Sequence, residues 1–188
     1  MGFWTFGSTY SDTTALAITR YVAERGALPP TSRQIAKDIR MSPSSLTSAF
    51  ESRSEMIRRS AASWAAHHSE RQRDKVAQQG WAGFVPSDPE EILEARAWLC
   101  WRAMSIGDPE MSEAVADAGR AQRRRLSGEL RADGVSYEAD DLLVRTTSSL
   151  LDGLIDAIAA PTDALDPHHA AVVWGDHRSW LIDRRATA

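Results

Sequence analysis

The sequence predicts an all-α fold. Apolar residues recur at the three- and four-residue spacing of a helix face through most of the chain, and no segment shows the alternation of a half-buried strand. Glycine and proline separate these periodic segments, and several of them begin with a serine or threonine that can cap a helix. These observations predict about nine helices, of which three short ones precede a long one and five follow it.

The first two helices are defined by their end signals. The first covers about 12–25 and ends at Gly26, because glycine readily adopts the left-handed conformation that closes a helix. The second begins at Thr31, which with Gln34 has the spacing of a capping box. Both helices are short, and a Pro-Pro pair separates them.

The third and fourth helices also begin with capping signals. Ser42 can cap the third helix, and Pro43 occupies its first position, where the missing N–H has no helical partner to lose. Ser52 and Glu55 repeat the capping-box spacing at the start of the fourth helix. That helix runs through 53–79 without a break, which is long enough to connect two domains.

The second half of the chain predicts a loop followed by five helices. Residues 80–89 are rich in glycine and proline, which is typical of a loop. Glycine, proline or aspartate bounds each of the helices that follow, which we expect over 90–106, 108–118, 120–132, 137–159 and 168–185.

Composition bounds the class of protein. A chain of 188 residues can bury a sizeable core in one or two domains. The net charge is −4, yet residues 1–60 carry eight Lys/Arg against five Asp/Glu, a net +3, whereas the remainder carries fourteen against twenty-one, a net −7. A basic head on an acidic body favours a small DNA-binding domain attached to a second domain. We place the boundary between residues 1–57 and 58–188.

Several functions find no support in the sequence. No apolar run approaches the roughly 18 residues of a membrane span. The N-terminus lacks the pattern of a signal peptide, so we expect a cytoplasmic protein. Cys100 is the single cysteine and lies between tryptophans, which suits neither a disulfide, a zinc cluster nor a reactive thiolate. The adjacent histidine pairs point about 100° apart on a helix. We therefore predict no metal, no cofactor and no enzymatic activity.

Residues 32–50 have the pattern of a helix-turn-helix. Apolar side chains would pin the second helix of the pair, and small hydroxyl side chains would form its outer face. The apolar positions are Ile35, Ile39, Met41, Leu46 and Phe50, and the outer face is Ser44, Ser45, Thr47 and Ser48. Short hydroxyl side chains let a helix approach a DNA groove closely, and helix N-termini offer N–H groups to phosphates. The alternative is ordinary helical packing with serines facing water.

The run from residue 31 to residue 57, TSRQIAKDIRMSPSSLTSAFESRSEMI, resembles the DNA-binding signature of the tetracycline-repressor (TetR) family. Its pattern reads roughly T-V-R-D-I-A-x-x-A-G-V-S-x-G-T-L-Y-x-H-F-x-S-K-E-E-L. The positions that match without a gap are Thr31, Arg33, Ile35, Ala36, Ser42, Leu46, Phe50, Ser52 and Glu55, and those with similar residues are Met41, Arg53 and Met56. The segment ALAITRYVAERG, ending at Gly26, resembles the first helix of the family.

Four positions depart from this pattern. Arg40 and Ser44 stand where the family has glycine, Thr47 replaces an aromatic residue, and Ala49 replaces His or Tyr. The basic arm that often precedes the first helix is also missing. If Arg40 keeps a positive φ, a non-glycine residue there costs roughly 1–2 kcal/mol. Either the turn is reshaped or Arg40 compensates by contacting a phosphate.

The resemblance implies a dimeric transcription regulator, most often a repressor, that a small-molecule effector releases from a near-palindromic operator in double-stranded DNA. The residues that we expect to contact DNA are Thr31, Ser32, Arg33, Arg40, Ser44, Ser45, Thr47, Ser48 and Arg53. The alternative is a dimeric ligand- or protein-binding helical module with a degenerate DNA-binding head, for which the departures above are the evidence. An enzyme is the third possibility.

The family also implies a dimer formed by the last two helices and an effector pocket in the body. Broad apolar bands on those helices favour a partner surface, with completion of the chain's own core as the alternative. The expected interface residues are Leu150, Leu151, Leu154, Ile158, Val173, Trp174, Trp180 and Leu181. For an apolar or aromatic effector we expect a pocket lined by Trp64, Trp98, Trp101 and Met104, although ordinary core packing also explains these residues.

Overall fold

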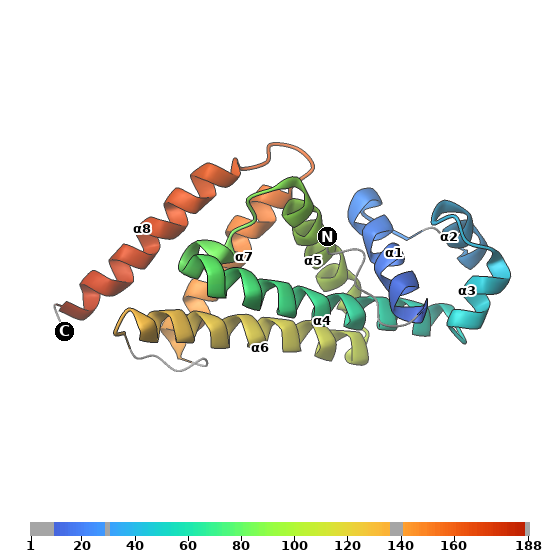
Figure 1. Cartoon of the computed structure of the whole chain (residues 1–188), viewed down its shortest axis with the longest axis horizontal. Helices are drawn as coiled ribbons and strands as arrows, with labels where there is room; N and C mark the ends of the chain where they lie inside the picture. The colour runs from blue at the N-terminus through green and yellow to red at the C-terminus, as the bar shows by residue number, and fades with distance from the viewer. Residues whose placement is uncertain (1–9, 29–30, 136–140, 187–188) are drawn as a thin grey trace. The chain divides into compact units, whose positions relative to one another are not determined.

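The computed structural model describes residues 10–28, 31–135 and 141–186, and within them it is all-α, as the sequence predicts (Figure 1). Eight α-helices and one 3₁₀ helix account for the regular structure of these residues. In chain order they are α1 (Tyr10–Arg25), α2 (Ser32–Asp38), α3 (Pro43–Ala49), α4 (Arg53–Gln79), η2 (Gly80–Phe84), α5 (Pro89–Ser105), α6 (Pro109–Ala132), α7 (Leu142–Ala159) and α8 (Pro167–Ala186).

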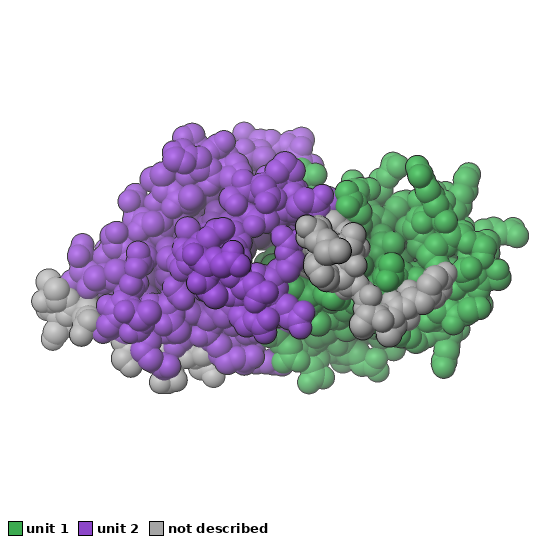
Figure 2. Space-filling view, viewed as in Figure 1, with its two compact units in different colours: residues 1–68, 96–117 green, residues 69–95, 118–188 purple. Residues whose placement is uncertain are grey.

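The chain forms two compact units (Figure 2). Unit 1 consists of residues 1–68 and 96–117, and unit 2 consists of residues 69–95 and 118–188. Unit 1 therefore holds the first three helices together with parts of α4, α5 and α6. The predicted boundary between a DNA-binding domain at 1–57 and an effector-binding and dimerisation domain at 58–188 divides the chain by function, and it stays a prediction.

The core of unit 1 follows the apolar stripes of its short helices. Both α1 and α2 pack against α3. Ile35 on α2 is fully buried, and Leu46 and Phe50 anchor α3. Gly26 closes α1 with φ +78, and its N–H donates to the carbonyl of Val22 at 2.7 Å, which confirms the predicted helix end. The short helices are thus held by buried anchors, since seven-residue helices are marginal alone.

The prediction of two helices over 108–118 and 120–132 is wrong, because α6 continues through Gly119. A glycine inside a helix costs only about 1 kcal/mol relative to alanine. The buried positions 111, 115, 118, 122, 126 and 130 form one unbroken stripe across it. Burial of that stripe outweighs the local preference of a single glycine.

The expected loop at 80–89 begins with a buried 3₁₀ helix. Trp81, Phe84 and Val85 are each at most 5% exposed. Gly83 permits this arrangement, since a Cβ there would lie 2.8 Å from backbone atoms of Lys75 and Val76. The segment therefore belongs to the core of unit 2, where η2 packs against α8.

The last two helices pack against each other within unit 2. Of the range 137–159 expected for the first of them, the structure has the part from Leu142 onward, and residues 137–140 lie outside the described residues. Asp141 caps α7, with its carboxylate accepting from the N–H of Leu143 at 2.8 Å. Within the described ranges no helix has both the length and the apolar character that a membrane span requires.

Candidate nucleic-acid interface and ligand site

The predicted caps of the helix pair are present. Thr31 has extended backbone angles, and its hydroxyl oxygen accepts from the N–H of Gln34 at 3.2 Å. Ser42 does the same for α3, accepting from the N–H of Ser45 at 3.0 Å. Each cap meets one of the otherwise unsatisfied donors of a helix N-terminus.

The turn between the two helices keeps the left-handed residue. Arg40 has φ +59 and its side chain is exposed. Its N–H donates to the carbonyl of Lys37 at 3.1 Å, and the next N–H, of Met41, donates to the carbonyl of Ala36 at 2.7 Å. This pair of bonds is a Schellman motif, which satisfies the carbonyls at the end of α2. Of the two alternatives for Arg40, reshaping of the turn is therefore wrong.

The outer face of α3 carries hydroxyls, as predicted. Ser44, Thr47 and Ser48 are exposed and Ser45 is half-buried. The Thr47 hydroxyl donates to the Pro43 carbonyl at 2.8 Å, and the Ser48 hydroxyl donates to the Ser44 carbonyl at 2.9 Å. Hydroxyl groups that bond back to carbonyls of their own helix lie close to the helix backbone. No long side chain therefore projects from the outer face of α3.

Cationic side chains precede and follow α3 in the sequence. Arg33, Lys37 and Arg40 are exposed, and Arg53 at the start of α4 is half-buried. The acid on α2, Asp38, accepts hydrogen bonds from Tyr21 at 3.0 Å and from Gln34 at 2.7 Å. The side chains of Arg33, Lys37 and Arg40 are therefore exposed to solvent, in the same helix-turn-helix segment as the hydroxyls of α3.

A hydrogen bond from Arg59 to the Ala49 carbonyl and a ring contact with Phe50 connect the end of α3 to α4. The N–H of Glu55 donates to Ser52 Oγ at 3.1 Å, which confirms the predicted cap of α4. The Glu55 carboxylate accepts from the backbone N–H of Glu51, and this bond is the largest cause of a lowered pKa at Glu55. Arg59 bonds that carboxylate at 3.2 Å and stacks over the Phe50 ring at 5.4 Å. The C-terminal end of α3 is thus held rigidly on α4.

The structure brings Trp64 and Trp98 together. Their ring centroids lie 5.4 Å apart, and both side chains are at most 6% exposed. Trp101, one turn further along α5, is fully buried, and Met104 after it is half-buried. All four expected pocket residues lie in unit 1. Their role as ligand contacts stays a prediction.

Sequence reasoning missed His68 as part of this cluster. Its ring stacks on Trp64 at 4.9 Å and lies 6.2 Å from Trp98. Trp64 and His68 are one helical turn apart, a spacing that could have indicated the contact. Cys100 on α5 faces α1 instead, with its thiol 3.7 Å from the carbonyl of Val22. Burial raises the pKa of the Cys100 thiol, which keeps it protonated.

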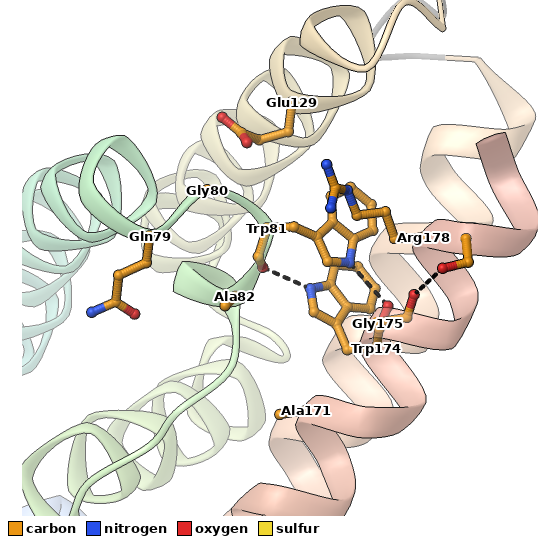
Figure 3. A pocket seen from close by; sticks show the side chains of 10 residues that line it. Gln79, Gly80, Trp81, Ala82, Glu129, Ala171, Trp174, Gly175 and Arg178 are labelled. Atoms are coloured by element: carbon orange, nitrogen blue, oxygen red, sulfur yellow. Dashed lines mark hydrogen bonds between the residues drawn. The ribbon is translucent and has the colours of Figure 1, made fainter.

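Unit 2 contains a separate hollow of about 510 Å³ (Figure 3). The indoles of Trp81 and Trp174 stack beside it at 4.4 Å, and each donates its N–H to the other's backbone carbonyl at 2.9 Å. Arg178 borders the hollow and bonds both carboxylate oxygens of Asp133, at 2.8 and 2.5 Å. Glu129 lies across from α8, and burial raises the pKa of its carboxyl group. Because both indole N–H groups are already bonded to backbone carbonyls, neither is available to donate to a ligand.

Most of the residues expected at a dimer interface are buried within their own chain. These are Leu151, Leu154, Ile158, Trp174 and Leu181. For them the structure favours the alternative, completion of the chain's own core, and the indole of Trp174 is fully engaged by Trp81. Leu150 is half-buried, while Val173 and Trp180 are 45% and 47% exposed. A dimer interface on the last two helices stays a prediction, and of the residues expected there only Leu150, Val173 and Trp180 are accessible to a partner.

Metal ligands do not gather in the described part of the chain: no three His, Cys, Asp or Glu side chains there could hold an ion. The adjacent His168 and His169 have ring centroids 6.2 Å apart at an angle of 44°.

Comparison with known proteins shows which fold this is. A transcriptional regulator from Rhodococcus sp. Rha1 has a TM-score of 0.78 at 18% identity, covering 93% of this chain and 97% of that one. A protein of Rhodococcus sp. assigned to the TetR family of transcriptional regulators gives 0.75 at 16% identity, covering 93% and 100%. A transcriptional regulator from Saccharomonospora viridis, solved in complex with choline, gives 0.73 at 18% identity, covering 90% and 95%.

These likenesses define the class as the fold of TetR-type transcriptional regulators, and they confirm the fold expected from the resemblance of residues 31–57. By sequence, the chain matches no family model and no curated protein.

Proposed function

We propose that the chain is a DNA-binding transcription regulator that acts as a homodimer and responds to a small-molecule effector. The observation that carries this proposal is the intact geometry of the helix pair: both helices are capped, the turn keeps φ +59 at Arg40, and exposed hydroxyls and cations share one segment. A helix-turn-helix places its second helix in the major groove, so α3 is the recognition helix. The regulator would work in the cytoplasm, where the DNA is.

Phosphate contacts would dominate binding. Recognition helix α3 has the sequence PSSLTSA and carries none of the Arg, Lys, Asn or Gln side chains that read bases with paired hydrogen bonds. Arg33, Arg40 and Arg53 would instead contact phosphates and fix the register, while Thr47 and its neighbouring serines read base edges. The N-termini of α2 and α3 add N–H donors through Ser32 and Ser44.

The exposed face of the last helix supports the dimer. Val172, Val173 and Trp180 on α8 are between 45% and 49% exposed, and Leu142 on α7 is 79% exposed. Large apolar side chains exposed together on one helix indicate a partner surface. A dimer through α7 and α8 would present two recognition helices, which must be about 34–36 Å apart to enter successive major grooves.

Helix α4 offers a route from an effector to the DNA. It begins at Arg53, is 27 residues long, and carries Trp64 eleven residues later, at a distance of about 16 Å along the helix axis. A ligand against Trp64 would therefore act on the same rigid helix that holds the end of α3. We infer that the ligand-free dimer binds the operator as a repressor. The effector can release the dimer from DNA only if it binds more tightly to the state of the dimer in which the two heads are not spaced to fit DNA.

The proposal is tested by selecting bound fragments from the genome and footprinting them. We expect a near-palindromic site whose half-sites are one helical turn apart. Arg53→Ala should weaken binding to all duplexes alike, whereas Thr47→Ala should change preference at a particular base pair. If no fragment is enriched, or if Arg53→Ala relaxes the preference at a single base pair, the assignment of these residues is wrong.

A further inference from the structure

Among the described residues of unit 1, three buried indole groups have no hydrogen-bond partner within the chain. The Nε1 atoms of Trp64, Trp98 and Trp101 are all shielded from solvent, and the three side chains are 0%, 6% and 0% exposed. An indole N–H can only donate, so each of these groups requires an acceptor. Buried donors in folded proteins are nearly always met, either by the protein, by ordered water or by a ligand.

The three indoles lie on two helices of unit 1. Trp64 lies on α4, and Trp98 and Trp101 lie one turn apart on α5. The Trp64 and Trp98 rings are in contact, with centroids 5.4 Å apart, and His68 stacks on the first of them at 4.9 Å. The Trp64 and Trp98 rings therefore form one cluster between α4 and α5, with Trp101 one turn further along α5, and the polar group of each indole is a donor.

Elsewhere this chain satisfies its buried indoles. In unit 2 the N–H groups of Trp81 and Trp174 are both bonded to backbone carbonyls at 2.9 Å, although these rings are as deeply buried as those in unit 1. That pair is the pattern expected of tryptophans with a packing role only. The cluster in unit 1 lacks such partners, which indicates that its acceptors come from outside the chain.

The charge around the cluster favours an anion over a cation. The Arg102 guanidinium lies over the Trp98 ring, 5.5 Å from its centroid, so one electron-rich face of that ring already holds a cation, whose charge repels a second cation and attracts an anion. The indole N–H edges carry partial positive charge as well.

We propose that the cluster of Trp64, Trp98 and Trp101 binds a small molecule with an apolar body and a carboxylate group, whose oxygens accept from the indole N–H donors. This inference rests on the proposed function, because it names the chemical class of the effector. It also separates this chain from the neighbour solved with choline, a quaternary ammonium compound without a carboxylate.

The test compares ligands that share a body and differ in the head group. Isothermal titration of the full chain without DNA would use benzoate against benzyltrimethylammonium, and octanoate against octyltrimethylammonium, at fixed ionic strength. We expect the carboxylate of at least one pair to bind about tenfold or more tightly than its ammonium analogue, as for hydrogen bonds to a charged group. Tighter binding of both ammonium compounds would overturn the proposal.

Three substitutions locate the site. Each of the variants keeps an aromatic ring and removes one indole donor, so each should lower the affinity for the carboxylate about tenfold. These variants are Trp64→Phe, Trp98→Phe and Trp101→Phe. Trp81→Phe is the matched control, since it removes an equally buried indole donor in unit 2 and should leave the affinity for the carboxylate unchanged. Thermal unfolding of each variant confirms that it is folded.

The remaining outcomes are also decisive. If neither carboxylate binds, or if all four variants behave alike, the donors serve ordered water and the proposal is wrong. Because the titration contains no DNA, the two proposals fail separately. If the chain binds a carboxylate at the cluster but does not bind DNA, the ligand site is supported and the proposed regulator function is refuted. If it binds an operator but no carboxylate, the regulator function is supported and the ligand site is refuted.

Discussion

The turn residue Arg40 should reveal a conflict between stability and DNA affinity. It holds φ +59, a region in which a non-glycine residue costs roughly 1–2 kcal/mol. Arg40→Gly removes that penalty, but glycine adds freedom to the unfolded chain that is worth about 0.4–1 kcal/mol. The difference predicts a net gain of about 0.5–1 kcal/mol, or roughly 2 °C in Tm for a chain of this length.

The same substitution should weaken DNA binding. Loss of one phosphate contact reduces the slope of log K against log salt by about 0.9 for each protomer, which is about 1.8 for a dimer. Thermal unfolding measures the first effect, and fluorescence anisotropy on an operator duplex across a salt series measures the second. Arginine at this position is explained if the DNA affinity that its side chain adds offsets the stability that its strained backbone costs.

Arg40→Ala is the control that separates the two effects. It removes the guanidinium but keeps a Cβ in the left-handed conformation, so it should match Arg40→Gly in salt slope without its gain in Tm. If the glycine variant is no more stable than the alanine variant, the strain argument is wrong. If both keep the slope of the unsubstituted chain, Arg40 does not contact phosphate.

Further predictions concern single contacts. Ser42→Ala removes the cap of α3 and should destabilise unit 1 by about 1 kcal/mol, measured by urea unfolding. Trp81→Phe removes the indole N–H that donates to the Trp174 carbonyl and should cost about 0.5–1.5 kcal/mol, whereas an unchanged midpoint would refute the role of that bond. Trp180→Asp should convert a dimer to a monomer in light scattering and abolish tight operator binding, and a dimer that persists would place the interface elsewhere. Burial lowers the pKa of His177, so its contribution to stability is complete above the unfolded-state pKa of about 6.5 and is lost as pH falls below it. His177→Gln should therefore lose less stability on acidification, as followed by Tm against pH.

The helix pair could be predicted from sequence because its determinants are local. A serine cap lies within three residues of the N–H that it meets, and the turn at Arg40 is closed by bonds that span at most five residues. Apolar spacing then decides which face is buried, as at Leu46 and Phe50. These signals are contained in one short stretch, and the structure reproduces them.

The features that sequence reasoning missed are non-local. Trp81 and Trp174 are 93 residues apart, and nothing in the composition of the segment 80–89 shows that it will be buried against α8. The single helix α6 depends on a stripe whose burial outweighs Gly119. Apolar bands such as that of α7 show that a surface will be covered, but periodicity cannot tell whether the same chain or a partner covers it.

The central claim, that this is a regulator whose head binds DNA, is tested most directly by anisotropy. A labelled duplex from upstream of the chain's own gene would be compared with a scrambled duplex between about 50 and 200 mM salt, a range over which six to ten phosphate contacts change affinity by roughly 10³–10⁵. The account predicts tight binding to the first duplex, with a steep fall in salt and a much weaker affinity for the second. Equal and weak binding to both duplexes and to genomic fragments would contradict it and favour a ligand-binding module with a lapsed head.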